Sequence, residues 1–433
     1  MGICTKFQPL GYQTSSGDTN RSFIKKIAIN YLGEAAKGYF FLDREKNVWV
    51  FGSGLYAGTA YPIGNLTTPT RLFRNVKKLI PFEGVGYLEG SSTWGFVLFI
   101  GTDNKLYFYG GKTFTSVFGL GTSYTGYSTP IAILSDVKDA WVFNIWGKVT
   151  IYALTSAGKL YACGDNSNNQ FGNNTGTSSQ AWVEILDNVD KFVPVQNQYG
   201  QMFLFAEKGG GIYLSNYSAS VTFAGQTYSD SYSTFREITI NENETLLPDK
   251  IEGVIAPTYY SFLNGSSYQT YSSIGLVSKN VVYTNIGMGF AQYFGVNTSV
   301  EAKDIIRLWY GFAVSETNTI KYYAYSNTTL MPINDYKLTT LLDNVQISKL
   351  FSYDNGGYLG YLTSSGDLYR ANVYNSSFSK ASENVSIIQT LGTASTYCYI
   401  KDDNSGYYGT WGESYNSNIQ LPAFNTTNTN WQN

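Results

Sequence analysis

One short phrase recurs along the chain: an apolar strand, a polar turn with Gly or Asn, and a second strand centred on Tyr or Trp. The clearest copy covers residues 151–166, and further copies cover 41–52, 99–110 and 361–369. Weaker copies are centred near Tyr213, Tyr283, Tyr322 and Tyr408. The turn residues supply positive φ or local hydrogen bonds, and the flanking β-branched and aromatic residues suit a pleated, half-buried surface. The phrase therefore predicts a tight β-hairpin, made eight times.

A second apolar phrase follows most hairpins after a polar loop of variable length. Its copies cover residues 76–80, 137–141, 189–193, 302–306 and 345–350. Each copy predicts a further strand that leads into the next hairpin. Repetition at this spacing is typical of the blades of a β-propeller. We therefore expect an all-β fold, a closed β-propeller of seven or eight blades.

The two ends of the repeat array suggest how the ring closes. A further copy of the second phrase, residues 24–29, precedes the first hairpin, whereas no copy follows the last hairpin near Tyr408. We therefore expect the N-terminal strand to complete the last blade, which would hide the open sheet edges. The expected organisation is an N-terminal arm at 1–21, a propeller at 22–420 and a polar C-terminal tail at 421–433.

Residues 154–172, Leu-Thr-Ser-Ala-Gly-Lys-Leu-Tyr-Ala-Cys-Gly-Asp-Asn-Ser-Asn-Asn-Gln-Phe-Gly, carry a family resemblance. This stretch resembles the repeat of the regulator of chromosome condensation family, in which a Trp or similar residue stands at the place of Cys163 and Gly-Gln-Leu-Gly at 169–172. The resemblance spans about 22–420 and fades between 200 and 345. Such propellers usually have seven blades, so eight hairpins either mark a departure or split one irregular blade between 272 and 350.

The composition restricts the classes of molecule that the chain is expected to bind. Only 14% of residues are charged, with 29 basic against 31 acidic residues, and no Lys/Arg run exceeds two. Such a chain lacks the basic footprint that holds a phosphate backbone, so we expect no nucleic-acid partner. The N-terminal residues show no apolar signal core, and no apolar run approaches the roughly 20 residues of a membrane span, so neither Sec export nor membrane insertion is expected.

Catalytic and metal-binding patterns are sparse. The sequence has no His, and Cys4, Cys163 and Cys398 are too scattered for a disulfide framework or a CxxC metal site. Residues 402–406 lack the third carboxylate and distal Glu of a calcium loop, and 208–213 lack a following helix to bind phosphate, so both are interpreted as hairpin turns.

Paired carboxylates remain an open alternative, because two acidic residues from distant blades can meet in space. The candidates are Asp43, Asp103, Glu184 and Asp230, all of which also suit turns or a solvated rim. No pair stands out in the sequence. We therefore expect no enzymatic activity, no catalytic residues, no cofactor and no metal.

Tyrosine is the most unusual bulk feature, with 38 residues. It clusters in polar loops, where Tyr124, Tyr127, Tyr228 and Tyr232 are the candidate binding residues. An aromatic ring with a hydroxyl tip offers a large contact area at modest entropic cost. Packing on the propeller face without a partner is the other interpretation of these tyrosines.

The resemblance implies three precedents: guanine-nucleotide exchange, protein inhibition, and adhesive or structural modules. Fold alone does not choose among them. Low charge, abundant Tyr, Asn, Ser and Gly, dense β-structure and no export signal favour a bacteriophage virion protein, tail- or fibre-associated, acting in assembly or host-surface attachment. Its partners would be other virion proteins or host cell-surface molecules. The alternative is an exported adhesin or carbohydrate-binding propeller at the bacterial surface.

Overall fold

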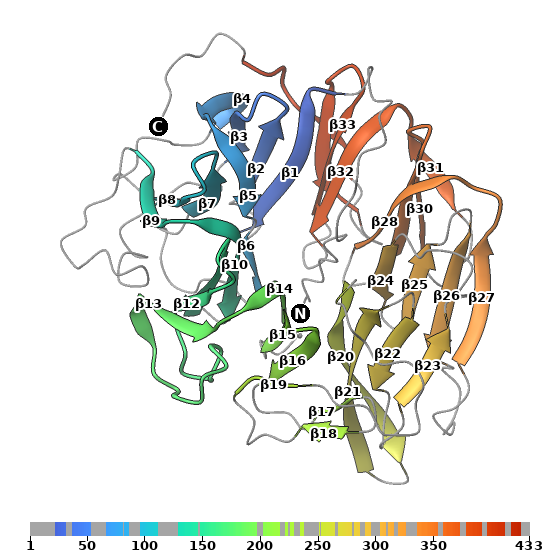
Figure 1. The fold of residues 1–433 in the computed structure, drawn as a ribbon. Coiled ribbons are helices and arrows are strands. Elements are labelled where there is room, and N and C mark those ends of the chain that lie inside the picture. Colours follow the sequence, from blue (N-terminus) through green and yellow to red (C-terminus); the bar gives the residue numbers. More distant parts are fainter. Residues whose placement is uncertain are drawn as a thin grey trace. The chain divides into compact units, whose positions relative to one another are not determined.

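A computed structural model gives the fold of the chain, and the described residues lie between Ser22 and Asn425 (Figure 1). The residues outside the description are 1–21, 32–36, 53–65, 81, 86–95, 111–128, 146–147, 197–201, 217–220, 224–225, 229–233, 238–250, 252, 265–266, 279–280, 286–290, 296–303, 309–310, 316–318, 326–335, 354–357, 373–377, 392–395, 412–416 and 426–433. Every regular element in the described part is a β-strand, so the expected all-β class is confirmed.

The strands form successive sheets, numbered here in chain order, and the chain falls into two compact units. The terminal unit comprises Gly17–Phe171, Thr175–Val189 and Val385–Asn433, and the middle unit includes Gly172–Asn174 and Asp190–Asn384. Seven sheets in the described residues have four strands, and the third sheet has five. A small two-stranded sheet of β17 (Val221–Phe223) and β18 (Gln226–Tyr228) accompanies them.

The terminal unit holds the first, second, third and eighth sheets. The first sheet is β1 (Ile24–Tyr31), β2 (Lys37–Asp43), β3 (Val48–Gly52) and β4 (Leu66–Phe73). The second is β5 (Val76–Ile80), β7 (Phe96–Gly101), β8 (Leu106–Gly110) and β9 (Ile131–Leu134). The third is β6 (Phe82–Val85), β10 (Val137–Ile145), β11 (Lys148–Thr155), β12 (Leu160–Gly164) and β13 (Ser179–Leu186). The eighth is β32 (Val385–Leu391), β33 (Thr396–Lys401), β34 (Gly406–Thr410) and β35 (Ile419–Gln420).

The middle unit holds the fourth to seventh sheets. The fourth is β14 (Val189–Gln196), β15 (Met202–Lys208), β16 (Gly211–Asn216) and β19 (Arg236–Glu237). The fifth is β20 (Gly253–Asn264), β21 (Ser267–Ser278), β22 (Val281–Asn285) and β23 (Ala291–Gly295). The sixth is β24 (Asp304–Leu308), β25 (Gly311–Ser315), β26 (Ile320–Tyr325) and β27 (Tyr336–Leu342). The seventh is β28 (Ile347–Tyr353), β29 (Tyr358–Thr363), β30 (Leu368–Asn372) and β31 (Ser379–Ser382).

The expected hairpins are confirmed as the central pair of strands in each sheet. The pairs are β2–β3, β7–β8, β11–β12, β15–β16, β21–β22, β25–β26, β29–β30 and β33–β34, all antiparallel. The predicted copies of the second phrase form the strands that precede their hairpins, as in β5, β10 and β28. Each sheet thus has the strand order of a propeller blade, read directly along the chain.

The expected exchange of the N-terminal strand into the last sheet is wrong. Strand β1 pairs with β2 along Ile27–Tyr31 and belongs to the first sheet. The last sheet obtains its fourth strand from its own C-terminal side, where β35 pairs with β34. The copy at 24–29 is therefore the ordinary leading strand of its own hairpin, and β35 escaped notice because it is only two residues long.

Both faces of the first sheet are covered, which explains its unbroken apolar runs. Along β2, Phe40 and Leu42 pack against the second sheet, whereas Tyr39 and Phe41 pack against the eighth. Side chains alternate between the faces of a strand, so a sheet buried on both sides needs apolar residues at every position. The second and third sheets also share an apolar cluster, to which Phe108 and Ile151 belong. The order in the terminal unit is therefore eighth, first, second, third.

Strand β6 extends the third sheet beyond its four antiparallel strands. It follows β5 of the second sheet and pairs in parallel with β10, Phe82 lying opposite Val142 and Val85 opposite Ile145. In the middle unit, Ile320 of the sixth sheet joins Ile347, Leu359 and Tyr361 of the seventh in one cluster. Face-to-face packing of successive sheets therefore recurs there.

Candidate interaction surface

The hairpin turns share one backbone geometry in five sheets. The turns are 43–47, 101–105, 155–159, 363–367 and 401–405. In each, the first amide donates to the fifth carbonyl at 2.8–2.9 Å and the fourth amide donates to the first carbonyl at 3.0–3.2 Å. The fourth residue has positive φ, at Lys46, Asn104, Gly158, Gly366 and Asn404. This is a three-residue loop with a left-handed bulge, which Gly and Asn favour.

Two of these turns also hold the next sheet of the terminal unit. The fourth carbonyl of the turn accepts the amide of the first residue of the following leading strand, from Lys46 to Val76 and from Asn104 to Val137, at 2.9 and 2.7 Å, and the Gly158 carbonyl accepts the Val189 amide within the same unit at 2.8 Å. These inter-sheet bonds use only the backbone. The side chain at the fourth position is therefore free to vary as long as the left-handed conformation is tolerated.

Two of the acidic candidates, Asp43 and Asp103, are confirmed as turn residues, and Asp230 lies outside the described residues. Asp43 is 3% exposed, and its carboxylate accepts the Asn47 amide at 2.7 Å and the Trp49 indole N–H at 2.9 Å. Asp103 is exposed and accepts the Tyr107 hydroxyl at 2.8 Å. Burial acts to raise the pKa of Asp103, but the hydrogen bonds from Tyr107 and Lys105 outweigh it and lower the pKa. These carboxylates hold hairpins together.

The two other loops that were assigned to turns are also confirmed. In the last sheet, Asp403 accepts the Ser405 amide at 2.8 Å and the Ser405 hydroxyl at 2.6 Å, and these bonds lower the pKa of Asp403. In the fourth sheet, Gly209 and Gly210 both have positive φ and connect Lys208 directly to Gly211. The described residues contain no group of three or more Cys, Asp or Glu positioned to hold a metal ion.

An aromatic residue stands at the same register on the third strand of six sheets, two residues after the turn. The residues are Trp49, Tyr107, Tyr161, Tyr213, Tyr369 and Tyr407. Trp49 is buried, whereas the five tyrosines are half-buried. We call these five tyrosines the tyrosine row.

Cross-strand stacking fixes three members of this row. Tyr107 stacks on Phe99, Tyr369 on Tyr361 and Tyr407 on Tyr399, with centroids 5.3, 4.9 and 5.2 Å apart. In the third and fourth sheets the opposite residue is Ala153 or Ala206. Burial and the Asp103 carboxylate raise the pKa of Tyr107 to about 12. Its phenol therefore remains a protonated hydrogen-bond donor at neutral pH.

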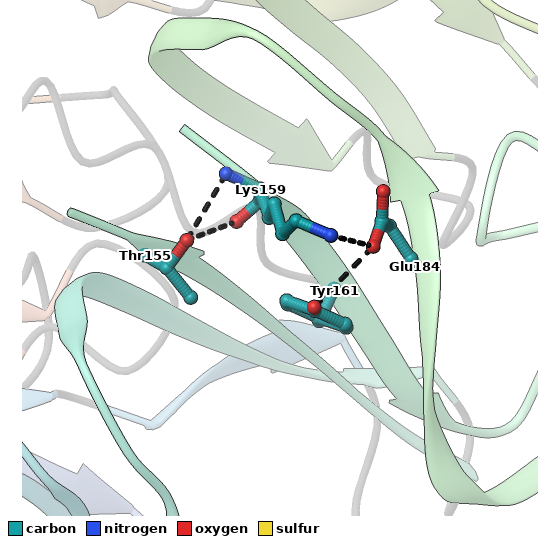
Figure 2. A network of polar contacts seen from close by, with 4 residues as sticks. All are labelled: Thr155, Lys159, Tyr161 and Glu184. Atoms are coloured by element: carbon teal, nitrogen blue, oxygen red, sulfur yellow. Dashed lines mark hydrogen bonds and ion pairs between the residues drawn. The ribbon is translucent and has the colours of Figure 1, made fainter. Parts of the chain in front are cut away.

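Polar groups on the outer strands border the row. Figure 2 shows the third sheet, where the Lys159 ammonium lies 2.8 Å from the Glu184 carboxylate and the Tyr161 hydroxyl donates to the same oxygen at 3.3 Å. Thr155 closes the turn by accepting the Lys159 amide at 3.0 Å. Glu184, a candidate acid in the sequence, is thus the ion-pair partner of Lys159, and its hydrogen bond and charge raise the pKa of that lysine.

The seventh sheet repeats this arrangement with the charges exchanged. Lys380, opposite Tyr369 on the outer strand, pairs with Asp367 at 2.8 Å and with Glu383 at 3.4 Å. The hydrogen bond that Lys380 donates to Asp367 raises the pKa of Lys380 despite some desolvation. A half-buried tyrosine with adjacent opposite charges therefore stands on sheets of both units.

The stretch that resembles the chromosome-condensation repeat forms an ordered polar loop after β12. Asn166 is 0% exposed; its Oδ1 accepts the Phe171 amide at 2.8 Å and its Nδ2 donates to Thr175 at 3.0 Å. Asp165 accepts the Gln170 side-chain amide at 2.7 Å, and Tyr152 donates to the Gln170 carbonyl at 2.5 Å. A network of hydrogen bonds around a buried asparagine fixes the loop in one conformation.

The described structure does not test the binding role predicted for the four tyrosines. Tyr124, Tyr127 and Tyr232 lie outside the described residues. Tyr228 ends β18, where it pairs with Val221. Sequence reasoning used most of these tyrosines to count hairpins, with Tyr408 in the place of Tyr407, and did not consider them as a surface. Their fixed place after each turn was the signal that could have identified them.

No helix in the described part of the chain has the length and apolar content required to cross a bilayer. No family model matches the chain, and no curated protein matches it in sequence.

Solved structures of similar fold do exist. One is human WBSCR16, at 13% identity and a TM-score of 0.46, covering 79% of this chain and 96% of that one. Prp20p of Saccharomyces cerevisiae is 11% identical with a TM-score of 0.42, covering 70% and 80%. The β-propeller domain of Cps50 (Swd1) from Myceliophteria thermophila is 9% identical with a TM-score of 0.39, covering 90% and 96%.

Proposed function

We propose that this chain is a non-enzymatic, closed eight-bladed β-propeller that acts as a binding scaffold. The observation that carries the proposal is the tyrosine row, which repeats a half-buried phenol at one register on successive sheets. Phenols offer contact area and a hydrogen bond at low entropic cost. Because each tyrosine is held by the register of its own hairpin, and three of them also by stacking, a partner meets preformed contact positions on the sheets of each unit.

The roles of the acidic residues support binding rather than catalysis. Asp43 and Asp103 cap hairpin turns, and Glu184 holds Lys159. Groups committed to such structural bonds are poor general acids or bases, because protonation changes would break the turns that they hold. The proposal accordingly includes no cofactor and no metal.

The proposed setting is the virion of a bacteriophage, with the propeller tail- or fibre-associated and acting in assembly or host attachment. Support comes from the 14% charged fraction and from a composition rich in Tyr, Asn, Ser and Gly. Surfaces made of such residues suit wet, adaptable contacts with neighbouring virion proteins or host cell-surface molecules.

The first experiment asks whether the native protein co-sediments with virus-sized particles from its source culture. Co-sedimentation that persists at high salt is expected, because contacts made by uncharged groups are weakly screened. Protein that remains in the supernatant would refute the virion setting.

A second experiment tests the surface itself. Replacing Tyr161 and Tyr369 by Ser should reduce binding to particles or host cells about tenfold or more, the usual effect of removing buried aromatic contacts. The matched control is Ser156→Ala with Ser364→Ala, which alters exposed turn positions of the same two sheets. Equal binding by both double variants would show that the tyrosine row is not the binding surface.

A further inference from the structure

The C-terminal segment passes from the eighth sheet to the first. After β35 pairs with β34, the Leu421 amide donates to the Gly406 carbonyl at 2.8 Å, and the Leu421 side chain is 5% exposed. Leu421 shares one apolar cluster with Cys398 and Ile400 of the eighth sheet and with Trp49 of the first. The segment therefore continues directly from β35 of the last sheet, and its first side chain, Leu421, is buried there.

Phe424 then contacts three aromatic residues of the first sheet. Its ring centroid lies 5.1 Å from that of Phe23, 5.3 Å from Phe41 and 5.3 Å from Trp49, each in an edge arrangement. We call these three residues the socket. Edge-to-face contacts of this kind add to the free energy of burying the rings.

The backbone of the segment continues onto the outer strand of the first sheet. Asn425 forms a parallel bridge with Thr70, and its amide donates to the Pro69 carbonyl at 2.9 Å. Addition of an extended segment to a sheet edge is a common mode of peptide recognition, in which main-chain bonds give affinity and side-chain pockets give specificity.

This junction differs from the others in the terminal unit because no short connection joins its two sheets. The first sheet runs into the second between Phe73 and Val76. The eighth and first sheets are the two ends of the chain, and β1 lies beside β32 (Figure 1). Their contact must be held by non-covalent bonds alone.

We propose that residues 421–425 are a clasp that holds the last sheet against the first. The socket is a recognition site for an extended, uncharged peptide with an aliphatic and an aromatic anchor three residues apart, and the chain fills it with its own Leu421 and Phe424. The clasp replaces the strand exchange that the sequence suggested. The proposal is independent of the partner that the propeller binds.

The test is amide hydrogen exchange, measured by mass spectrometry on the full chain with Phe424→Ala. Local opening is set by the contacts that a segment makes, so exchange in β1–β4 and β32–β35 should accelerate about tenfold or more. Exchange in β10–β13 should not change. The matched control is Ile419→Ala, because Ile419 lies just before the clasp but is 49% exposed, so its loss should leave every region unaltered.

Two results would overturn the clasp: no acceleration anywhere, or equal acceleration in all sheets. Phe424→Leu provides a second variant that keeps apolar bulk if the alanine variant does not fold. It should accelerate exchange less, and in the same two sheets only. A uniform effect of Phe424→Leu would equally refute a local clasp.

Discussion

The buried carboxylate of Asp43 gives the sharpest energetic prediction. It accepts three hydrogen bonds, from the Asn47 amide at 2.7 Å, the Asn47 side-chain nitrogen at 3.0 Å and the Trp49 indole at 2.9 Å. Asn47 and Trp49 are 8% and 3% exposed, so water has little access to replace the lost acceptor. Asp43→Ala leaves the Asn47 amide and the Trp49 indole without a protein partner, whereas the Asn47 side-chain nitrogen keeps the Glu45 carboxylate at 3.4 Å.

Each unsatisfied buried donor costs about 1–3 kcal/mol. The two donors left without a partner together predict a loss of about 2 kcal/mol or more from the unfolding free energy. Asp103→Ala is the matched control, because that carboxylate also accepts hydrogen bonds in a hairpin turn but is 43% exposed. Its loss should cost at most about 1 kcal/mol.

Urea unfolding followed by tryptophan fluorescence measures both variants. Equal losses for Asp43→Ala and Asp103→Ala would refute the argument that burial makes the first turn depend on its carboxylate. A loss below about 1 kcal/mol for Asp43→Ala would show that water reaches the donors after all.

Three further outcomes are expected. Asn404→Gly keeps the left-handed backbone but removes the acceptor for two donors at the start of the first sheet, so it should lower the unfolding free energy by about 1–2 kcal/mol in thermal unfolding. The control, Asn104→Gly, should lie within about 0.5 kcal/mol of wild type. Burial raises the pKa of Cys163 to about 12 and that of Cys398 well above its ordinary value. At pH 8 neither thiol should therefore react with iodoacetamide until the protein is unfolded, as judged by peptide mass spectrometry. Labelling of either cysteine in the native protein would contradict its burial. Gly360→Ala should lower the unfolding free energy by about 1–3 kcal/mol in the same thermal assay, because a Cβ there would lie 2.1 Å from a ring carbon of the buried Phe351. An unchanged melting temperature would refute that close packing.

Local turn chemistry made the hairpins predictable from the sequence. A Gly or Asn at the fourth turn position, such as Gly158 or Asn104, permits the left-handed backbone, and the alternation of apolar residues places strands on either side. These signals lie within a few residues of one another, so no knowledge of distant contacts was needed.

The acceptor role of Asp43 was beyond sequence reasoning. The same slot of the turn holds Gly101 in the second sheet and Thr155 in the third. Only the burial of Trp49 across the hairpin makes the carboxylate of Asp43 indispensable. The polar partners of the tyrosine row were equally difficult to predict. Glu184 and Lys380 lie on the outer strands of their sheets, and loops of irregular length separate them from the tyrosines in the sequence.

The junction of the chain ends shows why one asparagine is needed where other residues suffice. Within the terminal unit, the fourth turn carbonyl receives the next leading strand, so Lys46 and Asn104 serve alike. At Asn404 the side-chain oxygen takes this role instead, accepting the Phe23 amide at 2.9 Å and the Ser22 hydroxyl at 2.9 Å. Every residue can supply a backbone carbonyl as the acceptor. A side-chain carbonyl at a position with positive φ favours Asn, because Asn tolerates that conformation. The contact between the last and the first sheets, which no short connection joins, therefore depends on particular side chains. Asn404 is one of them, and Phe424 in its socket is another.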